Sequence, residues 1–201
     1  MSRLIKTVSA DGTAASASGL TETQVDARIA AKQPWTFLEQ VDISSPTAAV
    51  ILETNSDYST FMILIDQGMG TTSSYFQARY LTTTSASSWI SSGYGVNQYR
   101  GRSSSNAYQY NENTSQIQFG LDSTDHAKNI EFVFTTTKNG KRPVFRFHYG
   151  GGTSTYDPAF AIGGGQLNMS TSTDIAAMYI YPNTGNIASG SFKIYGLNDH
   201  D

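Results

Sequence analysis

Cysteine is absent from the 201-residue chain, which excludes disulfides, zinc–thiolate sites and thiol nucleophiles. Charge is also sparse, because only 14% of the residues are charged, against roughly 25% in ordinary soluble domains. Solubility must therefore depend on the abundant Ser, Thr, Asn and Gln. The net charge is −3 and no basic stripe is present, so the electrostatic signature of nucleic-acid binding is missing.

Long apolar runs are missing as well. The N-terminal stretch MSRLIKTVSADG lacks the apolar segment of about 7–15 residues that a signal peptide contains. No run of about 18 apolar residues could span a membrane. The sequence therefore predicts a soluble protein that is made in the cytoplasm and has no membrane partner.

Alternating apolar and polar residues dominate the sequence after Trp35. About ten short runs of this kind, separated by Gly, Asn, Asp and Pro, predict antiparallel strands. The pair Asn139–Gly140 suits a tight hairpin turn. We therefore expect a mainly β protein, an antiparallel β-sandwich of jelly-roll type over residues 35–201. Its expected core includes Ile117, Phe119, Leu121, Ile130, Phe132, Phe134, Phe145, Phe147, Tyr149, Met178, Ile180, Phe192 and Ile194.

Residues 1–34 read differently, as a flexible arm followed by a short connector helix. Thr21 is in a position to cap a helix over Glu22–Lys32, and Pro34 ends it. Its apolar face is narrow and consists of Val25 and Ile29, four residues apart. Two interpretations are open: the helix packs on its own domain, or it forms a seam between identical chains and serves oligomerisation and attachment.

Two segments rich in Gly and Ser interrupt the strand pattern, Ser91–Gln116 and His148–Gln166, and neither is expected to be strand throughout. The first combines tyrosines with small polar residues, which is the composition of adaptable recognition loops. Tyrosine rings also suit stacking against sugar rings. The alternative is a sandwich edge or an inter-subunit contact made of the same residues. The predicted exposed binding surface comprises Tyr94, Tyr99, Arg100, Arg102, Tyr108 and Tyr110.

Catalytic motifs are missing, since no GxSxG, HExxH or phosphate-binding glycine loop occurs. His126 lies near Asp122 and Asp125, but this spacing is more typical of a turn that caps its own backbone than of a cation site. His148 is expected to face solvent or a neighbouring strand. No acidic pair stands out for glycoside hydrolysis. The sequence thus predicts a non-enzymatic protein without a metal or cofactor, although its candidate carboxylates are Glu39, Glu53, Glu112 and Glu131.

The C-terminal segment PNTGNIASGSFKIYGLND resembles the ending of many tailed-phage virion proteins, in which such a segment closes a β-sandwich. The opening WTFLEQVDIS is similar to the start of these domains, and LTETQVDARI is similar to a short helical stalk that precedes trimeric fibre and tail-tip domains. The residues that carry the C-terminal resemblance are Gly185, Asn186, Ile187, Ser189, Gly190, Ser191, Tyr195 and Gly196.

The resemblance implies a virion surface protein, either a fibre or tail-tip head or a capsid fibre or decoration protein. Its expected partners are copies of itself in a trimer, other virion proteins through the N-terminal arm, and a host-surface glycan bound with avidity. A free carbohydrate-binding module is the alternative and would be a monomer. A depolymerase would need two acidic groups with separated pKa values in one groove.

Overall fold

The computed structural model describes residues 7–8, 14–15, 34–102, 106–123, 127–137, 140–154, 157–168 and 174–197. The chain divides into two units, Met1–Pro34 and Trp35–Asp201. In the first unit the structure describes Pro34 and the paired strands β1 (Thr7–Val8) and β2 (Ala14–Ala15). The predicted helix Glu22–Lys32, with Val25 and Ile29, lies outside the described residues. No described segment is a helix able to cross a membrane.

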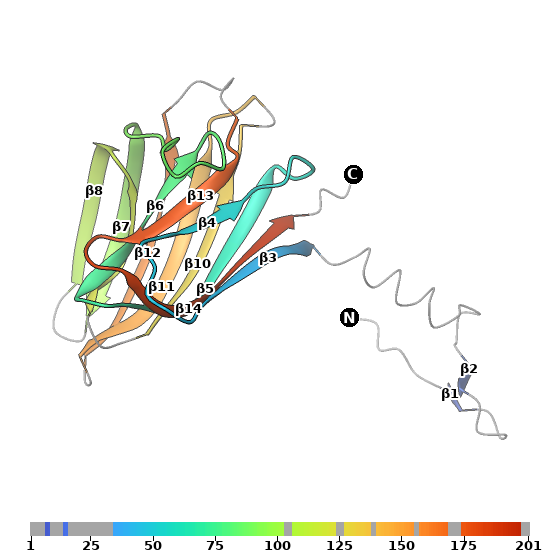
Figure 1. The fold of residues 1–201 in the computed structure, drawn as a ribbon, viewed down its shortest axis with the longest axis horizontal. Coiled ribbons are helices and arrows are strands. Elements are labelled where there is room, and N and C mark those ends of the chain that lie inside the picture. The colour runs from blue at the N-terminus through green and yellow to red at the C-terminus, as the bar shows by residue number, and fades with distance from the viewer. Residues whose placement is uncertain are drawn as a thin grey trace. The chain divides into compact units, whose positions relative to one another are not determined.

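The second unit consists of two antiparallel sheets, and Figure 1 shows the smaller one in front of the larger. The larger sheet has the strand order β3-β14-β5-β10-β11-β12-β7-β8, and the smaller has β4-β13-β6-β9. The larger sheet contains β3 (Trp35–Ile43), β5 (Thr60–Gly70), β7 (Tyr94–Arg102), β8 (Asn106–Thr114), β10 (Lys128–Thr135), β11 (Val144–Ser154), β12 (Asp157–Leu167) and β14 (Ile187–Leu197). The smaller contains β4 (Val50–Glu53), β6 (Ser74–Leu81), β9 (Ile117–Ser123) and β13 (Ala177–Pro182). The predicted mainly β, antiparallel architecture is confirmed.

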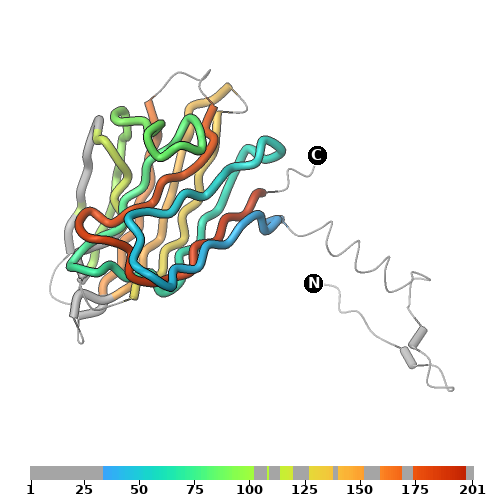
Figure 2. Tube along the Cα trace, viewed as in Figure 1, coloured from blue at the N-terminus to red at the C-terminus, as the bar shows by residue number. Residues whose placement is uncertain are grey.

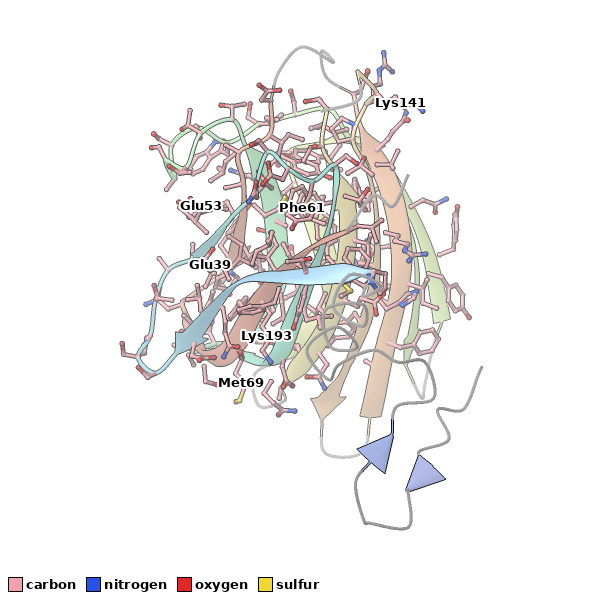
Figure 3. All side chains as sticks on the ribbon, turned by 90° about the vertical axis from the view of Figure 1, so that its right-hand side faces the viewer. Glu39, Glu53, Phe61, Met69, Lys141 and Lys193 are labelled. Atoms are coloured by element: carbon pink, nitrogen blue, oxygen red, sulfur yellow. The ribbon has the colours of Figure 1, made fainter. Side chains whose placement is uncertain are left out.

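Aromatic side chains fill the space between the sheets. Phe119 of the smaller sheet lies edge-on to two rings of the larger, with centroid distances of 5.0 Å to Phe132 and 5.3 Å to Phe147. Phe76 meets Phe192 in the same way at 6.0 Å. Such pairs contribute about 0.5–1.5 kcal/mol each beyond the area they bury. Figure 3 shows Phe61 inside this layer and Lys141 at the surface.

Most of each glycine-rich segment is strand, which is more strand than the sequence pattern predicts. They form the hairpin β7–β8 and the hairpin β11–β12, and β12 pairs with β7 along its length. The physical reason is close packing. Phe145 pairs with Gly165 across the ladder, and a Cβ on Gly165 would lie 2.8 Å from the Phe145 ring and would collide with the Gly95 carbonyl oxygen. Glycine therefore makes room for an aromatic ring on the neighbouring strand.

The C-terminal strand β14 agrees with its sequence pattern. Phe192 and Ile194 are fully buried, whereas Lys193 and Tyr195 are half-buried on the outer face. Gly190 has a φ of +135° where the pairing of β14 with β5 shifts register, and its backbone closely approaches that of Gly68. A side chain at this position would be strained, which explains why a glycine stands there.

Tyr80 and Tyr94 join the two sheets at one end of the core. Their rings stack with centroids 6.0 Å apart, and both side chains have no exposed surface. The Tyr94 hydroxyl accepts a hydrogen bond from the Tyr80 N–H at 2.9 Å and donates one to the Ile90 carbonyl at 3.1 Å. Tyr94 thereby fixes segment 82–93, the green loop at the upper end of the sandwich in Figure 2, against β6.

The free energy of unfolding should fall as the pH rises above about 10, the ordinary pKa of tyrosine. Burial raises the pKa of both Tyr80 and Tyr94 above that value. The folded state therefore keeps two protons that the unfolded state releases, and each group lowers stability by about 1 kcal/mol per pH unit until it ionises. Denaturant titrations between pH 8 and 12 check this. Tyr94→Phe should reduce the slope, and an unchanged slope in that variant would contradict the assignment.

Candidate functional site

The predicted binding residues do not share one face of the sandwich. Tyr99 and Tyr108 are directly paired on β7 and β8 and are 41% and 66% exposed on the outer face of the larger sheet. Phe160 and Ile162 of β12 are also exposed there, with the Phe160 ring centroid 6.0 Å from that of Tyr99. We call Tyr99, Tyr108, Phe160 and Ile162 the outer patch.

The remaining predicted binding residues lie elsewhere. Tyr94 is fully buried, so its predicted place in an exposed surface is wrong, because the side chains of a strand alternate and Tyr94 shares the inward face with Val96. Arg100 pairs with the buried Ala161 and is half-buried. Arg102 and Tyr110 belong to β7 and β8 by their backbone, but their side chains lie outside what the structure describes.

A second aromatic group lies on the outer face of the smaller sheet. The Arg79 guanidinium on β6 lies over two rings, 4.9 Å from the Trp89 centroid and 5.3 Å from that of Tyr181. Tyr179 joins both rings, at 5.8 Å from Trp89 and 5.0 Å from Tyr181. We call these four residues the arginine–aromatic cluster. Three rings and one cation thus form a continuous surface.

Local structure explains how the cluster assembles. Tyr179 and Tyr181 are two residues apart on β13, so both point outward, and the register of β13 with β6 sets Tyr179 opposite Arg79. Trp89 comes from segment 82–93 and forms a β-bridge with Leu81 at the end of β6. The Ile90 N–H donates to the Tyr80 carbonyl at 2.9 Å, which holds Trp89 beside the sheet.

Hydroxyl groups within segment 82–93 hold the loop in shape. The Ser88 hydroxyl donates to the Thr83 carbonyl at 3.0 Å and is also within 2.8 Å of the Ser85 carbonyl. The Thr82 N–H donates to the Ser88 carbonyl at 3.2 Å. Trp89 remains 41% exposed although its backbone is bonded on both sides. The ring is therefore presented to solvent by a loop whose backbone is already ordered, which lowers the entropic cost of ligand binding.

Glutamine side chains border the cluster. Arg79 Nη2 donates to Gln116 Oε1 at 3.1 Å, and the Ser115 hydroxyl bonds the same oxygen. Gln77 of β6 pairs with Gln118 of β9 on one side and with Tyr181 of β13 on the other. Gln116 and Gln118 also line a niche of about 50 Å³ with Val96, Gln98 and Thr114. Amides have donors and acceptors suited to hydroxyl-rich ligands.

The cluster consists of one cation and three aromatic rings, without a carboxylate or a histidine. Its side chains are an arginine and neutral aromatic residues, and burial raises the pKa of Tyr181 so that its hydroxyl stays protonated near neutral pH. Exposed rings of this kind bind the apolar faces of ligands, while arginine and amides bind polar groups. The arrangement suits a ring-shaped ligand with hydroxyl groups, such as a sugar.

The candidate carboxylates do not gather around this cluster. Glu39 and Glu53 are neighbours near one edge of the sandwich, where the Glu39 carboxylate accepts from the Glu53 N–H at 3.4 Å (Figure 3). Glu131 lies on the outer face of the larger sheet, 3.9 Å from Nδ1 of His148. The His148 side chain is 58% exposed, as its strand position predicts. The side chain of Glu112 lies outside the described residues.

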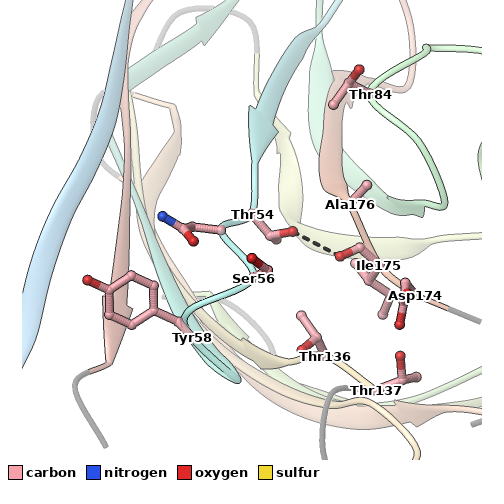
Figure 4. Close-up of a pocket in the computed structure, with 10 residues that line it drawn as sticks. Thr54, Ser56, Tyr58, Thr84, Thr136, Thr137, Asp174, Ile175 and Ala176 are labelled. Atoms are coloured by element: carbon pink, nitrogen blue, oxygen red, sulfur yellow. Dashed lines mark hydrogen bonds between the residues drawn. The ribbon is translucent and has the colours of Figure 1, made fainter.

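Two larger hollows lie away from the arginine–aromatic cluster. One, of about 560 Å³, is lined mostly by hydroxyl and amide side chains with the single carboxylate of Asp174 (Figure 4). There the Thr54 hydroxyl donates to the Ile175 carbonyl at 2.9 Å. The other, of about 440 Å³, contains Asp66, Glu131, His148 and Lys193 on the larger sheet. Each hollow is lined by a single tyrosine, Tyr58 in the first and the buried Tyr149 in the second, so neither presents several rings together.

The described residues contain no group of three His, Asp or Glu side chains placed to hold a metal ion. Two of the residues considered at the sequence level, Asp125 and His126, lie outside the described part of the chain, as does the side chain of Asp122. Neither a protein-family model nor a curated protein matches the sequence.

Sequence reasoning missed the arginine–aromatic cluster, although part of a signal was present. In AMYIYP, the alternation of Tyr179 and Tyr181 with Met178 and Ile180 indicates two tyrosines on the outward face of a strand. Arg79 has the same outward phase in SYFQARYL. Their meeting with Trp89 depends on the pairing of β13 with β6, which joins segments about 100 residues apart and has no local signature.

Proposed function

We propose that this protein is a non-enzymatic surface protein of a tailed-phage virion, whose β-sandwich binds a host-surface glycan through the arginine–aromatic cluster. The observation that carries the proposal is the set of rings around Arg79, with Trp89 stacked beside the cation at 4.9 Å and 41% exposed. The rings suit the apolar faces of sugars, and the neighbouring amides suit their hydroxyl groups.

The strand order supports a jelly-roll description of the sandwich. In a jelly roll, the first, eighth, third and sixth strands form one sheet, and the second, seventh, fourth and fifth form the other. Numbering β4 to β10 as the first seven strands and β13 as the eighth reproduces the smaller sheet. The larger sheet then follows the same rule with the hairpin β11–β12 inserted between β10 and β7, and with β14 and β3 added beside β5.

The virion assignment rests on the resemblance of the C-terminal segment to phage virion proteins. That segment corresponds to β14 and the turn before it, and two of its glycines, Gly190 and Gly196, occupy positions of close backbone or ring approach. A Cβ on Gly196 would collide with the Tyr58 ring, and Gly190 lies against Gly68. The resemblance therefore concerns how the sandwich closes, and the glycan-binding part of the proposal depends on the cluster instead.

A glycan array probed with the full chain tests the binding part of this proposal. Retention on one class of glycan is the expected result, because an ordered ring platform selects one sugar geometry. Absence of retention on every glycan would contradict it. A free carbohydrate-binding module would use the same cluster, so the array does not separate the two functions, but oligomeric state does.

Changing Val25 and Ile29 together to aspartate should convert the expected trimer into a monomer. The reason is that two charges on the narrow apolar face of the predicted helix would have to be buried in the seam between chains. Light scattering of the full chain measures the mass, and Ala27→Asp, on the opposite side of the same helix, is the matched control. A monomeric wild-type chain would favour the free carbohydrate-binding module instead.

A further inference from the structure

We propose that the glycan bound by the arginine–aromatic cluster is acidic, and that Arg79 pairs with the carboxylate of a uronic or sialic acid residue. This inference rests on the proposed function, because it specifies the ligand of the same site. It predicts a chemical preference that a purely aromatic sugar platform would not have.

Arg79 has the charge and the surroundings that a carboxylate needs. No ion pair joins Arg79 to an acidic side chain among the described residues, whereas His148 and Glu131 on the other sheet lie 3.9 Å apart. The guanidinium of Arg79 instead contacts two neutral rings and one amide oxygen. A half-buried cation without an acidic partner attracts an anion, and the planar fork of arginine fits a carboxylate with two parallel hydrogen bonds.

Two further polar groups of the cluster have unused hydrogen-bonding capacity. Nε of Arg79 and the hydroxyl of Tyr181 are both buried and have no hydrogen-bond partner among the described residues. Both groups are shielded from solvent, so a ligand oxygen reaches them only when the side chains that cover them move. The hydrogen bonds then formed offset the cost of leaving buried polar groups unpaired. The Tyr181 hydroxyl is protonated near neutral pH and can donate to a carboxylate or to a sugar hydroxyl.

The charge balance favours a singly charged sugar over a densely charged polymer. Binding of a polyanion depends on several Lys and Arg side chains in one stripe. The cluster has one arginine, the chain has a net charge of −3, and Gln116 and Gln118 beside it are neutral. One carboxylate per recognised unit, with ring faces and hydroxyl groups around it, matches this composition.

Esterified glycans provide the test without any change to the protein. The full chain is applied to an array of oligosaccharides ending in uronic acid or sialic acid, each printed beside its methyl ester and beside neutral sugars. The expected result is that the acid is bound about tenfold or more tightly than its ester. The two acidic series distinguish a uronic from a sialic acid ligand.

Arg79→Gln should abolish the preference for the acid, so that acid and ester bind equally, while Arg79→Lys should retain part of it. Equal binding of acid and ester by the wild-type chain would overturn the acidic-sugar inference and leave glycan binding intact. A preference for the acid that persists in Arg79→Gln would also overturn it, because a residue other than Arg79 would then bind the sugar carboxylate. Absence of binding to every acidic, esterified and neutral sugar would overturn both proposals together.

Discussion

Replacement of Trp89 by alanine should weaken glycan binding by about tenfold or more and leave the fold intact. Central, rigid aromatic residues contribute most of the energy in binding sites of this kind, and a loss of about 1.4 kcal/mol is a factor of ten in affinity. Trp89 contacts both the Arg79 guanidinium and the Tyr179 ring. Its loss therefore removes the one ring that segment 82–93 contributes to the arginine–aromatic cluster. Calorimetric titration measures the effect.

Tyr108→Ala is the matched control for this experiment. Tyr108 is an exposed aromatic residue, as Trp89 is, but it belongs to the outer patch on the opposite sheet. Its replacement should change the affinity by less than about twofold, since residues outside a binding site contribute little. The opposite outcome, with Tyr108→Ala abolishing binding and Trp89→Ala tolerated, would place the binding surface at the outer patch, which contains the predicted residues Tyr99 and Tyr108.

Gly165→Ala should lower the free energy of unfolding by about 3 kcal/mol or more. The added methyl group would collide with the backbone carbonyl of Gly95 and would press on the Phe145 ring at 2.8 Å. Backbone cannot move aside as a side chain can, so the pairing of β12 with β7 would have to open. Because β7 and β8 form the end of the larger sheet, that opening would expose Val96 and Tyr94 from the core.

Gly150→Ala separates this steric effect from the general effect of adding a methyl group. Gly150 is exposed on the neighbouring strand β11, and a Cβ there would meet no atom within 4 Å. Its replacement should therefore change the free energy of unfolding by no more than about 1 kcal/mol, because the added methyl group restricts the unfolded chain and meets nothing in the folded one. Equal melting temperatures for the two variants would show that the close packing at Gly165 is not required.

The alternation of apolar and polar residues allowed most of the strands to be predicted from the sequence. The alternating residues of β10, β11 and β14 reach the core as expected, because an antiparallel sheet with one buried face must alternate. The glycine-rich strands escaped prediction because their stability comes from rings on adjacent strands. The rings of Phe145 and Phe147 fill the space beside Gly165 and Gly163. Strand propensity is assigned to single residues, so it does not include the contribution of a ring on the neighbouring strand.

The site was harder to predict than the fold, for two physical reasons. Within the first glycine-rich segment, Tyr94 and Tyr99 lie on opposite faces of strand β7. The composition of the segment, which groups its tyrosines together, does not distinguish the two faces. Recognising Val96 as a core residue in phase with Tyr94 would have separated them. The arginine–aromatic cluster needs the order of strands in the smaller sheet, and that order is fixed by long-range packing.

The indole signals of the two tryptophans allow the most direct test of glycan binding at the arginine–aromatic cluster. Trp35 and Trp89 are the only tryptophans in the sequence, so a ¹⁵N-labelled chain gives two indole N–H signals, which Trp89→Phe assigns. Titration with the glycan selected on the array should shift the Trp89 signal and leave the Trp35 signal in place. A saturable interaction that leaves Trp89 unchanged while shifting the amides of Tyr99 and Tyr108 would contradict the assignment of the site.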